Sequence, residues 1–269
     1  MKKIQIIFFA TLLISSIVFG DGFLKVSGKK IIIRIGGDFL WETYIEATGN
    51  LIKLTDFYKK QPALPLKSKI IFFLQKFVLK NASALAFNTN WQKDIFQKYY
   101  KLDGQKIFVV ENFYGGKAEN QDFDEKVFLW AGRQIKLKNL ETLKKAFAEA
   151  ERERPDIKLK ISEGISHEEL AEKIKNCYAV ILPSISDVAP NFVIDAISLN
   201  KPFILTKETG LYEKLKDIGI FIDPFDAEDI KEKILFLSED GNYKEYKKMV
   251  SGFNFTHSWR EIADEFLKI

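Results

Sequence analysis

Two cations and two carboxylates occur at fixed spacing in the second half of the chain. Arg133 and Lys138 follow Gly132 in one segment, and Asp187 is followed by Asp195 eight positions later. A guanidinium offers a planar fork to two phosphate oxygens, whereas an ammonium supplies a mobile point charge. Carboxylates accept hydrogen bonds from hydroxyl groups. Together, the four side chains would suit a diphosphate that carries hydroxyl-rich sugars.

Each of these residues also has a simpler interpretation. Arg133 and Lys138 could be solvated cations on an exposed loop. Asp187 precedes Pro190, and because proline favours the first turn of a helix, Asp187 could be a helix cap. Asp195 lies among apolar residues, where a buried carboxylate needs a partner. Ribose hydroxyls or a neighbouring lysine would both serve.

Strand and helix patterns alternate around these side chains. Strands are expected at residues 127–131, 157–161, 179–182, 202–206 and 219–222, and helices at 140–153, 166–176, 191–199, 227–237 and 243–250. A capping box from Ser166 to Glu169 should open the second of these helices. This alternation predicts a doubly wound parallel sheet. Ligands bind such sheets beyond the carboxyl ends of the strands, where both charged pairs fall.

The first half of the chain shows a similar pattern. Strands are expected at residues 31–35, 84–87 and 107–110, with a helix at 90–99. Residues 115–126 are polar and contain glycine, as is typical of a linker. We therefore predict an N-terminal domain at residues 1–115 and a C-terminal domain at residues 116–269.

The first twenty residues allow two interpretations. Residues 4–20 are apolar and follow a basic start, as in a signal peptide or an anchor. Alternatively, a buried strand at residues 4–8 and a helix at 11–18 would form a βαβ unit with the strand at 31–35. We favour the second interpretation, and with it a cytoplasmic protein.

Residues 67–81 have apolar side chains at helical spacing with lysines between them. An amphipathic helix could lie on a sheet or on a membrane surface. Residues 1–116 hold 17 Lys and Arg against 8 Asp and Glu, whereas residues 117–269 hold 24 against 29. The N-terminal half should therefore face any anionic partner, either a phosphorylated acceptor or the inner face of an anionic membrane. No basic run or recognisable binding motif indicates nucleic acid.

The composition argues against metal and redox chemistry. The chain has one cysteine, Cys177, and two histidines, His167 and His257. An internal disulfide and a cysteine-based zinc cluster are thereby excluded, and the histidines are too few for a histidine metal site. We expect no metal and no cofactor.

The four charged residues belong to a longer set of motifs. From Asn112 onward the chain resembles the retaining family 4 glycosyltransferases, which have the two-domain GT-B fold. The family's Gly-Arg-x4-Lys loop matches Gly132-Arg133 to Lys138, and its Pro-Ser-x-x-Glu-x7-Glu motif matches Pro183-Ser184 through Asp187 to Asp195. A Thr-x3-Gly-x2-Glu segment follows at residues 206–213, and the closing aromatic Ser-Trp helix fits residues 255–259. The resemblance implies an α/β fold of two Rossmann-like domains, with the N-terminal one incomplete.

The resemblance also implies an activity. The chain would be a hexosyltransferase of polysaccharide biosynthesis, moving a sugar with retention from a nucleotide-diphosphate sugar to a glycan or lipid-linked acceptor, without a metal. Arg133, Lys138 and Asp187 would act in catalysis, the first two by holding the diphosphate. Asp195 would bind the ribose. The implied donor-binding residues are Gly132, Arg133, Lys138, Asp187, Val188, Pro190, Asn191 and Asp195.

The chain departs from the family pattern at several positions. Both motif glutamates are aspartates, and Pro190 stands where the family often has glycine. The frequent histidine after the strand at residues 31–35 is absent, so Asp38 is the candidate on the acceptor side. Two alternatives stay open, a nucleotide-sugar-binding protein that has lost its activity and a nucleotide-sugar epimerase on the same scaffold.

Overall fold

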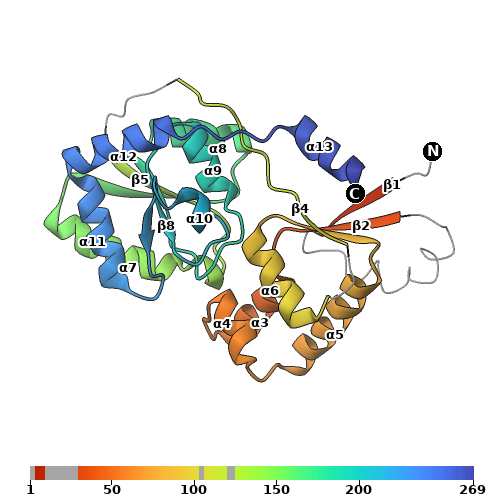
Figure 1. Ribbon diagram of the computed structural model, residues 1–269. Coiled ribbons are helices and arrows are strands. Elements are labelled where there is room, and N and C mark those ends of the chain that lie inside the picture. The colour runs from red at the N-terminus through yellow and green to blue at the C-terminus, as the bar shows by residue number, and fades with distance from the viewer. Residues whose placement is uncertain (1–3, 10–29, 103–105, 120–124) are drawn as a thin grey trace. The chain divides into compact units, whose positions relative to one another are not determined.

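The computed structural model describes residues 4–9, 30–102, 106–119 and 125–269, the first range by its backbone only (Figure 1). The chain forms two compact units. Unit 1 comprises the described parts of Met1–Asn50, Leu54–Asn112 and Trp259–Ile269, and unit 2 comprises the described parts of Leu51–Lys53 and Phe113–Ser258. The last helix, which we predicted in the C-terminal domain, thus groups with unit 1.

Unit 1 contains a parallel four-stranded sheet in the order β1-β2-β3-β4. Its strands are β1 (Ile4–Phe9), β2 (Lys30–Ile35), β3 (Ala84–Phe87) and β4 (Ile107–Val109), and its helices are α3 (Phe39–Thr48), α4 (Leu54–Lys60), α5 (Leu66–Asn81), α6 (Asn90–Tyr100) and α13 (Trp259–Lys268). The strand expected at residues 4–8 is present. The helix expected at residues 11–18 lies outside the described residues.

Side chains of β3 alternate between the two faces of this sheet. Ala84 and Ala86 pack with Ile262 and Phe266 of α13. Phe87 points to the other face, where its ring lies 5.4 Å from the ring of Phe96 in α6. Helices therefore cover both faces of the sheet. Within the described ranges, no helix is both long enough and apolar enough to cross a bilayer.

Unit 2 contains a parallel five-stranded sheet in the order β6-β5-β7-β8-β9. Its strands are β5 (Lys126–Ala131), β6 (Ile157–Ser162), β7 (Ala179–Leu182), β8 (Phe203–Thr206) and β9 (Ile220–Ile222). Its helices are the 3-10 turn η1 (Lys136–Lys138), α7 (Leu140–Glu153), α8 (His167–Asn176), α9 (Asn191–Ser198), α10 (Tyr212–Leu215), α11 (Ala227–Ser238) and α12 (Asp240–Gly252). Each strand predicted for this half is present, and the α/β architecture is confirmed.

Helices cover both faces of this sheet as well. Figure 1 shows α7 beside α11 and α8 beside α9, and both pairs are in contact. Because the sheet is covered on both sides, β7 and β8 are apolar along their whole length and every residue in them is buried. The capping box at Ser166 and Glu169 opens α8 as predicted.

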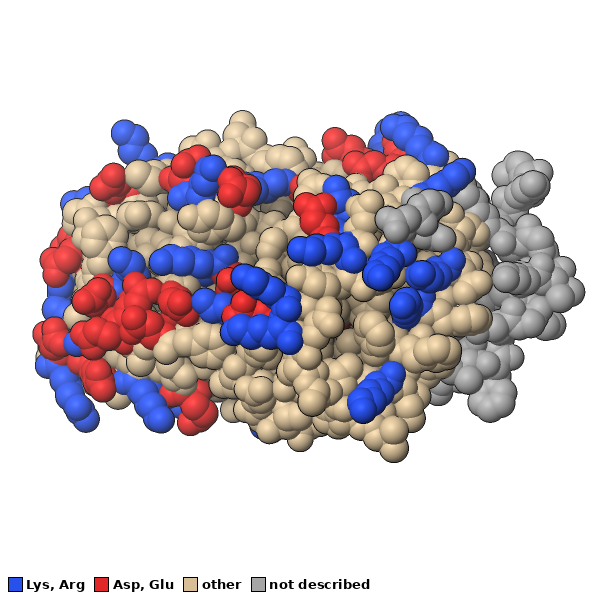
Figure 2. All heavy atoms as spheres, turned by 60° about the horizontal axis from the view of Figure 1, so that its bottom comes forward, with Lys and Arg blue, Asp and Glu red and all other residues tan. Residues whose placement is uncertain are grey.

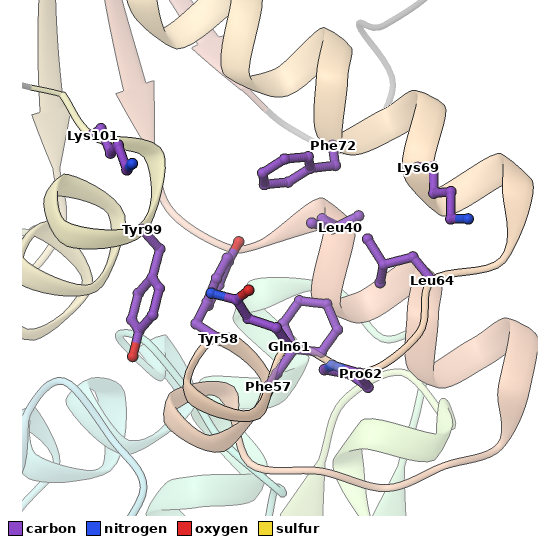
Figure 3. Close-up of a pocket in the computed structure, with 10 residues that line it drawn as sticks. All are labelled: Leu40, Phe57, Tyr58, Gln61, Pro62, Leu64, Lys69, Phe72, Tyr99 and Lys101. Carbon is purple, nitrogen blue, oxygen red and sulfur yellow. The ribbon is translucent and has the colours of Figure 1, made fainter.

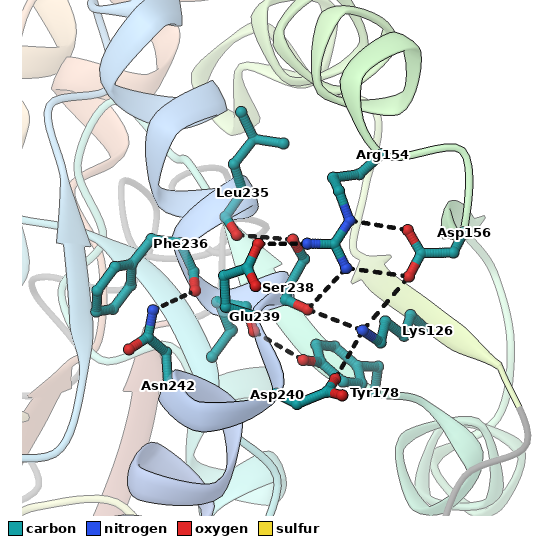
Figure 4. A network of polar contacts seen from close by, with 11 residues as sticks. Lys126, Arg154, Asp156, Tyr178, Leu235, Phe236, Ser238, Glu239, Asp240 and Asn242 are labelled. Carbon is teal, nitrogen blue, oxygen red and sulfur yellow. Dashed lines mark hydrogen bonds and ion pairs between the residues drawn. The ribbon is translucent and has the colours of Figure 1, made fainter.

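A polar network lies at the amino ends of these strands (Figure 4). Arg154 donates from Nε and Nη2 to the two carboxylate oxygens of Asp156, at 3.0 and 3.2 Å. Lys126 Nζ lies 2.9 Å from the carbonyl oxygen of Ser238. The hydrogen bonds from Arg154 are the main cause that lowers the pKa of Asp156 to about 2. These groups serve as structural pairs, at the end of the sheet opposite the predicted ligand site.

Candidate functional site

The loop after β5 is fixed by Asn139, which sequence reasoning did not nominate. Asn139 is buried and has a left-handed backbone (φ 57°), which asparagine tolerates. Its Nδ2 donates to the carbonyl oxygens of Pro183 at 3.1 Å and Pro224 at 2.6 Å. The preceding residue, Lys138, is thereby held beside the end of β7. An asparagine directly before a helical pattern was the available signal.

Lys138 and Asp187 form an ion pair. Lys138 Nζ lies 2.6 Å from Asp187 Oδ2, and the two side chains are 20% and 13% exposed. Ser184 Oγ lies 3.4 Å from the same oxygen. Asp187 does not cap α9, because the capping residue of that helix is Pro190 and the carboxylate of Asp187 pairs with Lys138 instead. The helix-cap interpretation of Asp187 is therefore wrong.

The backbone of Asp187 joins the ends of two strands. Its amide donates to the carbonyl oxygen of Glu208 at 2.8 Å, and its carbonyl accepts from the amide of Gly210 at 3.2 Å. Asp187 thus pairs in parallel with Thr209, which is buried. Residues 208–210, within the motif predicted at residues 206–213, therefore lie beside the backbone of Asp187.

Asp195 lies within α9 and contacts α8. Its Oδ2 is 3.4 Å from Nε2 of His167, the first residue of α8. Burial raises the pKa of the Asp195 carboxyl group, and His167 partly opposes the shift. In place of the neighbouring lysine that we considered, the structure puts an exposed histidine of a neighbouring helix beside this carboxylate, a residue that sequence reasoning did not link to it.

The other predicted donor-binding residues lie in the same connections. Gly132 follows β5 directly, and its amide donates to the carbonyl oxygen of Ser162 at 3.2 Å. Arg133, next in the loop, has an exposed side chain. Val188 and Pro190 are buried between β7 and α9, and Asn191 is exposed as the first residue of α9. All of them lie at the carboxyl ends of β5 and β7, as predicted.

Asp38, the candidate on the acceptor side, is buried in unit 1. It caps α3 by accepting from the amide of Trp41 at 3.0 Å, and the hydroxyl of Tyr58 donates to its other oxygen at 2.5 Å. Tyr58 also shares a 2.8 Å hydrogen bond with Tyr100. Burial raises the pKa of Asp38 to about 6. Both carboxylate oxygens are thus engaged inside the protein.

Tyr58 connects this buried group to a pocket of about 510 Å³ in unit 1 (Figure 3). The pocket is lined by Leu40, Phe57, Tyr58, Gln61, Pro62, Leu64, Lys69, Phe72, Tyr99 and Lys101. Its walls are mainly apolar and aromatic, and Lys69 and Lys101 stand on opposite sides of it in Figure 3. This size and lining suit a ligand with an apolar part.

No cluster of three or more His, Cys, Asp or Glu side chains is placed to hold a metal ion, as far as the described ranges extend. The polar groups at the carboxyl ends of the unit 2 strands therefore consist of cations, carboxylates, hydroxyls and backbone amides. Such a set can bind a phosphorylated and hydroxylated ligand through charge-assisted hydrogen bonds.

Residues 160–251 match the family model described as glycosyl transferases group 1. The matched region runs from β6 to α12 and includes Asp187, Asp195 and residues 206–213. Arg133 and Lys138 precede it. No curated protein sequence matches the chain significantly.

Solved structures resemble the whole fold. Sucrose-phosphate synthase from Thermosynechococcus elongatus is 16% identical, with a TM-score of 0.66 over 92% of this chain and 69% of its own. A mutant of S. aureus TarM, solved with fondaparinux, alpha-GlcNAc-glycerol and UDP, is 15% identical, with a TM-score of 0.65 over 92% of this chain and 53% of its own. A UDP-forming trehalose-phosphate synthase from Burkholderia xenovorans is 11% identical, with a TM-score of 0.68 over 99% of this chain and 73% of its own.

These comparisons establish the fold class. The chain has the GT-B type of fold, with two α/β units that each contain a parallel sheet flanked by helices. It spans about half the length of TarM and 69% and 73% of the other two proteins.

Proposed function

We propose that this chain is a retaining glycosyltransferase, which moves a hexose-type sugar from a nucleotide-diphosphate sugar to a glycan or lipid-linked acceptor. The observation that carries the proposal is the ion pair between Lys138 and Asp187 at the carboxyl ends of β5 and β7. The match of residues 160–251 to glycosyl transferases group 1 supports it. So does the UDP in the similarly folded TarM structure.

In this proposal Arg133 and Lys138 hold the diphosphate of the donor. The guanidinium binds two phosphate oxygens at once, and the ammonium adds a second positive charge. Negative charge builds up on the diphosphate as the bond to the sugar breaks. The two cations stabilise that charge, so they accelerate the step as well as bind the donor. This assigns to side chains the charge neutralisation that a metal ion would otherwise supply.

The carboxylates orient the rest of the donor. Asp187 accepts hydrogen bonds from the transferred sugar, assisted by the backbone between Val188 and Asn191. Asp195 binds the ribose hydroxyls, and its contact with His167 partly opposes the rise that burial causes in the pKa of its carboxyl group. Both acids are one methylene shorter than glutamate, so the ligand must lie correspondingly close to the backbone of these connections.

The transition state has oxocarbenium character, with positive charge on the sugar and negative charge on the departing diphosphate. Retention follows if the acceptor attacks from the face that the diphosphate leaves. The departing phosphate oxygen is then close enough to take the proton of the acceptor hydroxyl. No side chain is assigned as a catalytic base.

The acceptor is proposed to bind unit 1. The pocket lined by Tyr58, Phe72 and Tyr99 favours an acceptor with an apolar part, and Lys69 and Lys101 favour one that also carries negative charge. A lipid-linked phosphate has both properties. A glycan acceptor would instead use the aromatic side chains as stacking surfaces for sugar rings.

The donor site is tested by thermal stabilisation of the full chain with a panel of nucleotide sugars. We expect one or a few donors to raise the melting temperature, and Arg133→Ala and Lys138→Ala to abolish the shift. Lys144→Ala is the matched control, since Lys144 is a half-exposed cation of α7 that pairs only locally with Glu141. An unchanged shift in both site variants would show that the donor binds elsewhere.

A second candidate is a nucleotide-sugar-binding protein without transferase activity. The engagement of Asp38 as a buried helix cap favours it, because the acceptor-side carboxylate is then not available to a substrate. Donor binding without sugar transfer to any of a panel of glycan and lipid-linked acceptors would select this candidate. Conversion of the donor in the absence of acceptor would instead indicate an epimerase.

A further inference from the structure

Helix α5 exposes a continuous apolar stripe. Leu66, Ile70, Phe73 and Phe77 are 77%, 54%, 70% and 43% exposed. They are spaced by four, three and four positions, so they lie in one row along the helix. Four large apolar side chains gathered on one helix face mark an interaction surface, unlike the same residues scattered singly.

The stripe is not needed to hold α5 on unit 1. The opposite face of the helix already buries Ser68, Ile71 and Leu79. The ring of Phe72 lies 5.4 Å from that of Tyr100, and Gln75 donates to the Tyr100 hydroxyl at 2.9 Å. The helix is therefore anchored by one apolar face and presents a second one outward.

The charges of α5 have a single sign. The helix contains Lys67, Lys69, Lys76 and Lys80 and no acidic residue. At about 100° per residue, Lys69, Lys76 and Lys80 follow one edge of the stripe and Lys67 lies on the other side. Figure 2 shows the same character over this part of unit 1, where Lys and Arg side chains stand among uncharged ones and few acidic ones. An apolar row bordered by ammonium groups complements an anionic lipid surface.

We propose that unit 1 docks on an anionic phospholipid bilayer through α5, with Leu66, Ile70, Phe73 and Phe77 in the acyl layer. The helix lies in the plane of the membrane, because its 16 residues are too short and too charged to span it. The lysine side chains reach back to the lipid phosphates. A second copy of this chain is a poorer partner, since two such helices would bring like charges together.

Docking would also bring the pocket of unit 1 to the membrane. Lys69 and Phe72 of α5 line that pocket. A lipid-linked molecule in the bilayer would therefore meet the pocket directly beside the docked helix. The docking itself does not depend on sugar transfer, so it can be tested separately from the proposed function.

The test is co-sedimentation of the full chain with vesicles of phosphatidylcholine alone and of phosphatidylcholine with phosphatidylglycerol. We expect binding to the anionic vesicles and its loss at high salt. Replacing both Ile70 and Phe73 by serine should weaken binding by about tenfold or more, because each residue loses the transfer of its apolar surface into lipid. Leu267→Ser on α13 is the matched control, since Leu267 is 69% exposed outside the stripe, and should bind normally.

A second set of variants separates the contribution of the lysines from that of the apolar side chains. Replacing Lys67 and Lys80 by glutamine should reduce binding to the anionic vesicles by about thirtyfold, at about 1 kcal/mol for each lysine, whereas Lys98→Gln on α6 should not. Thermal melting without lipid checks that all variants fold. Equal binding by the Ile70/Phe73 variant would overturn the proposal. So would self-association without lipid that the same variant abolishes, because the stripe would then join copies of the chain.

Discussion

The ammonium of Lys138 lies 2.6 Å from the carboxylate of Asp187, so the acid of one proposed motif holds the cation of the other. A lysine ammonium has three hydrogens to donate. Lys138 can therefore keep Asp187 and still bind a phosphate oxygen. Because the side chain is already held in place, binding a ligand costs less side-chain entropy than it would for a free lysine.

The first prediction concerns this pair. Lys138→Met should weaken UDP binding by about tenfold or more, because one charge-assisted hydrogen bond is lost. Asp187→Asn should weaken it less, since the amide leaves the ammonium in place but holds it loosely. If Asp187 acts on UDP by positioning Lys138, the double variant should bind like Lys138→Met. Calorimetry with UDP on the natural chain, the two single variants and the double variant gives this comparison. If the losses of binding free energy in the single variants add up in the double variant, Asp187 acts independently of Lys138.

The second prediction separates Asp195 from His167. Asp195→Ala should weaken UDP binding, because the ribose hydroxyls lose their acceptor. His167→Ala should leave the affinity unchanged or tighten it, since the imidazole occupies the carboxylate oxygen that the ribose would use. Calorimetry with UDP, and with a deoxyribose analogue lacking one hydroxyl, measures both effects. If His167→Ala weakened UDP binding as much as Asp195→Ala does, the histidine itself would contact UDP.

The third prediction follows from the buried carboxyl group of Asp38. Its pKa rises from 3.8 to about 6 on folding, so the folded state binds more protons than the unfolded state between those values. Stability should therefore fall as the pH rises through this window, by up to about 3 kcal/mol. Asp38→Asn keeps an acceptor oxygen for the Trp41 amide and places an NH2 donor beside the Tyr58 hydroxyl, which can accept it, but does not titrate. Its unfolding free energy should lose this pH dependence and exceed that of the natural chain at pH 7.

Urea unfolding across the pH window measures this effect. Asp226→Asn is the control, because Asp226 caps α11 in the same way but is exposed. The control variant should keep the fall in stability between pH 4 and pH 6. An unchanged pH profile for Asp38→Asn would mean that the carboxyl group is better solvated than its surroundings indicate.

The fourth prediction concerns two glycines of unit 2. A methyl group at Gly219 would lie 2.5 Å from the ring of Phe203, whereas one at Gly241 would meet nothing within 4 Å. Gly219→Ala should therefore destabilise the protein by about 1–3 kcal/mol. Gly241→Ala, within α12, should be neutral or stabilise it by up to about 1 kcal/mol. Chemical denaturation checks both, and similar effects at the two sites would contradict the packing around β8.

The strands of unit 2 could be predicted because each is a short apolar run between helical patterns. Their carboxyl ends then located the loops that carry Arg133 and Asp187. The partners within those loops could not be predicted, since they come from distant segments. Nothing near Asp187 in the sequence indicates that its carboxylate would pair with Lys138 rather than cap α9. His167 reaches Asp195 only because α8 and α9 pack together.

Unit 1 was harder to predict. Asp38 was the acceptor-side candidate because it stands near the position of a frequent family histidine, but Tyr58, twenty residues later, donates to its carboxylate inside the protein. Helix α5 shows the opposite difficulty. The spacing of its apolar residues predicted a helix correctly. Because apolar residues occur on both faces of that helix, however, the sequence could not identify which face is exposed. Only the packing of Ile71 and Leu79 against the rest of unit 1 identifies Phe73 as an outward residue.

Cys177 is the one cysteine of the chain, and burial raises the pKa of its thiol to about 12. At neutral pH it should therefore not react with maleimide reagents. A cysteine introduced on the surface would take up a fluorophore selectively, without a cysteine-free background. One such position in each unit would allow energy transfer to measure whether adding UDP changes the distance between the two labels.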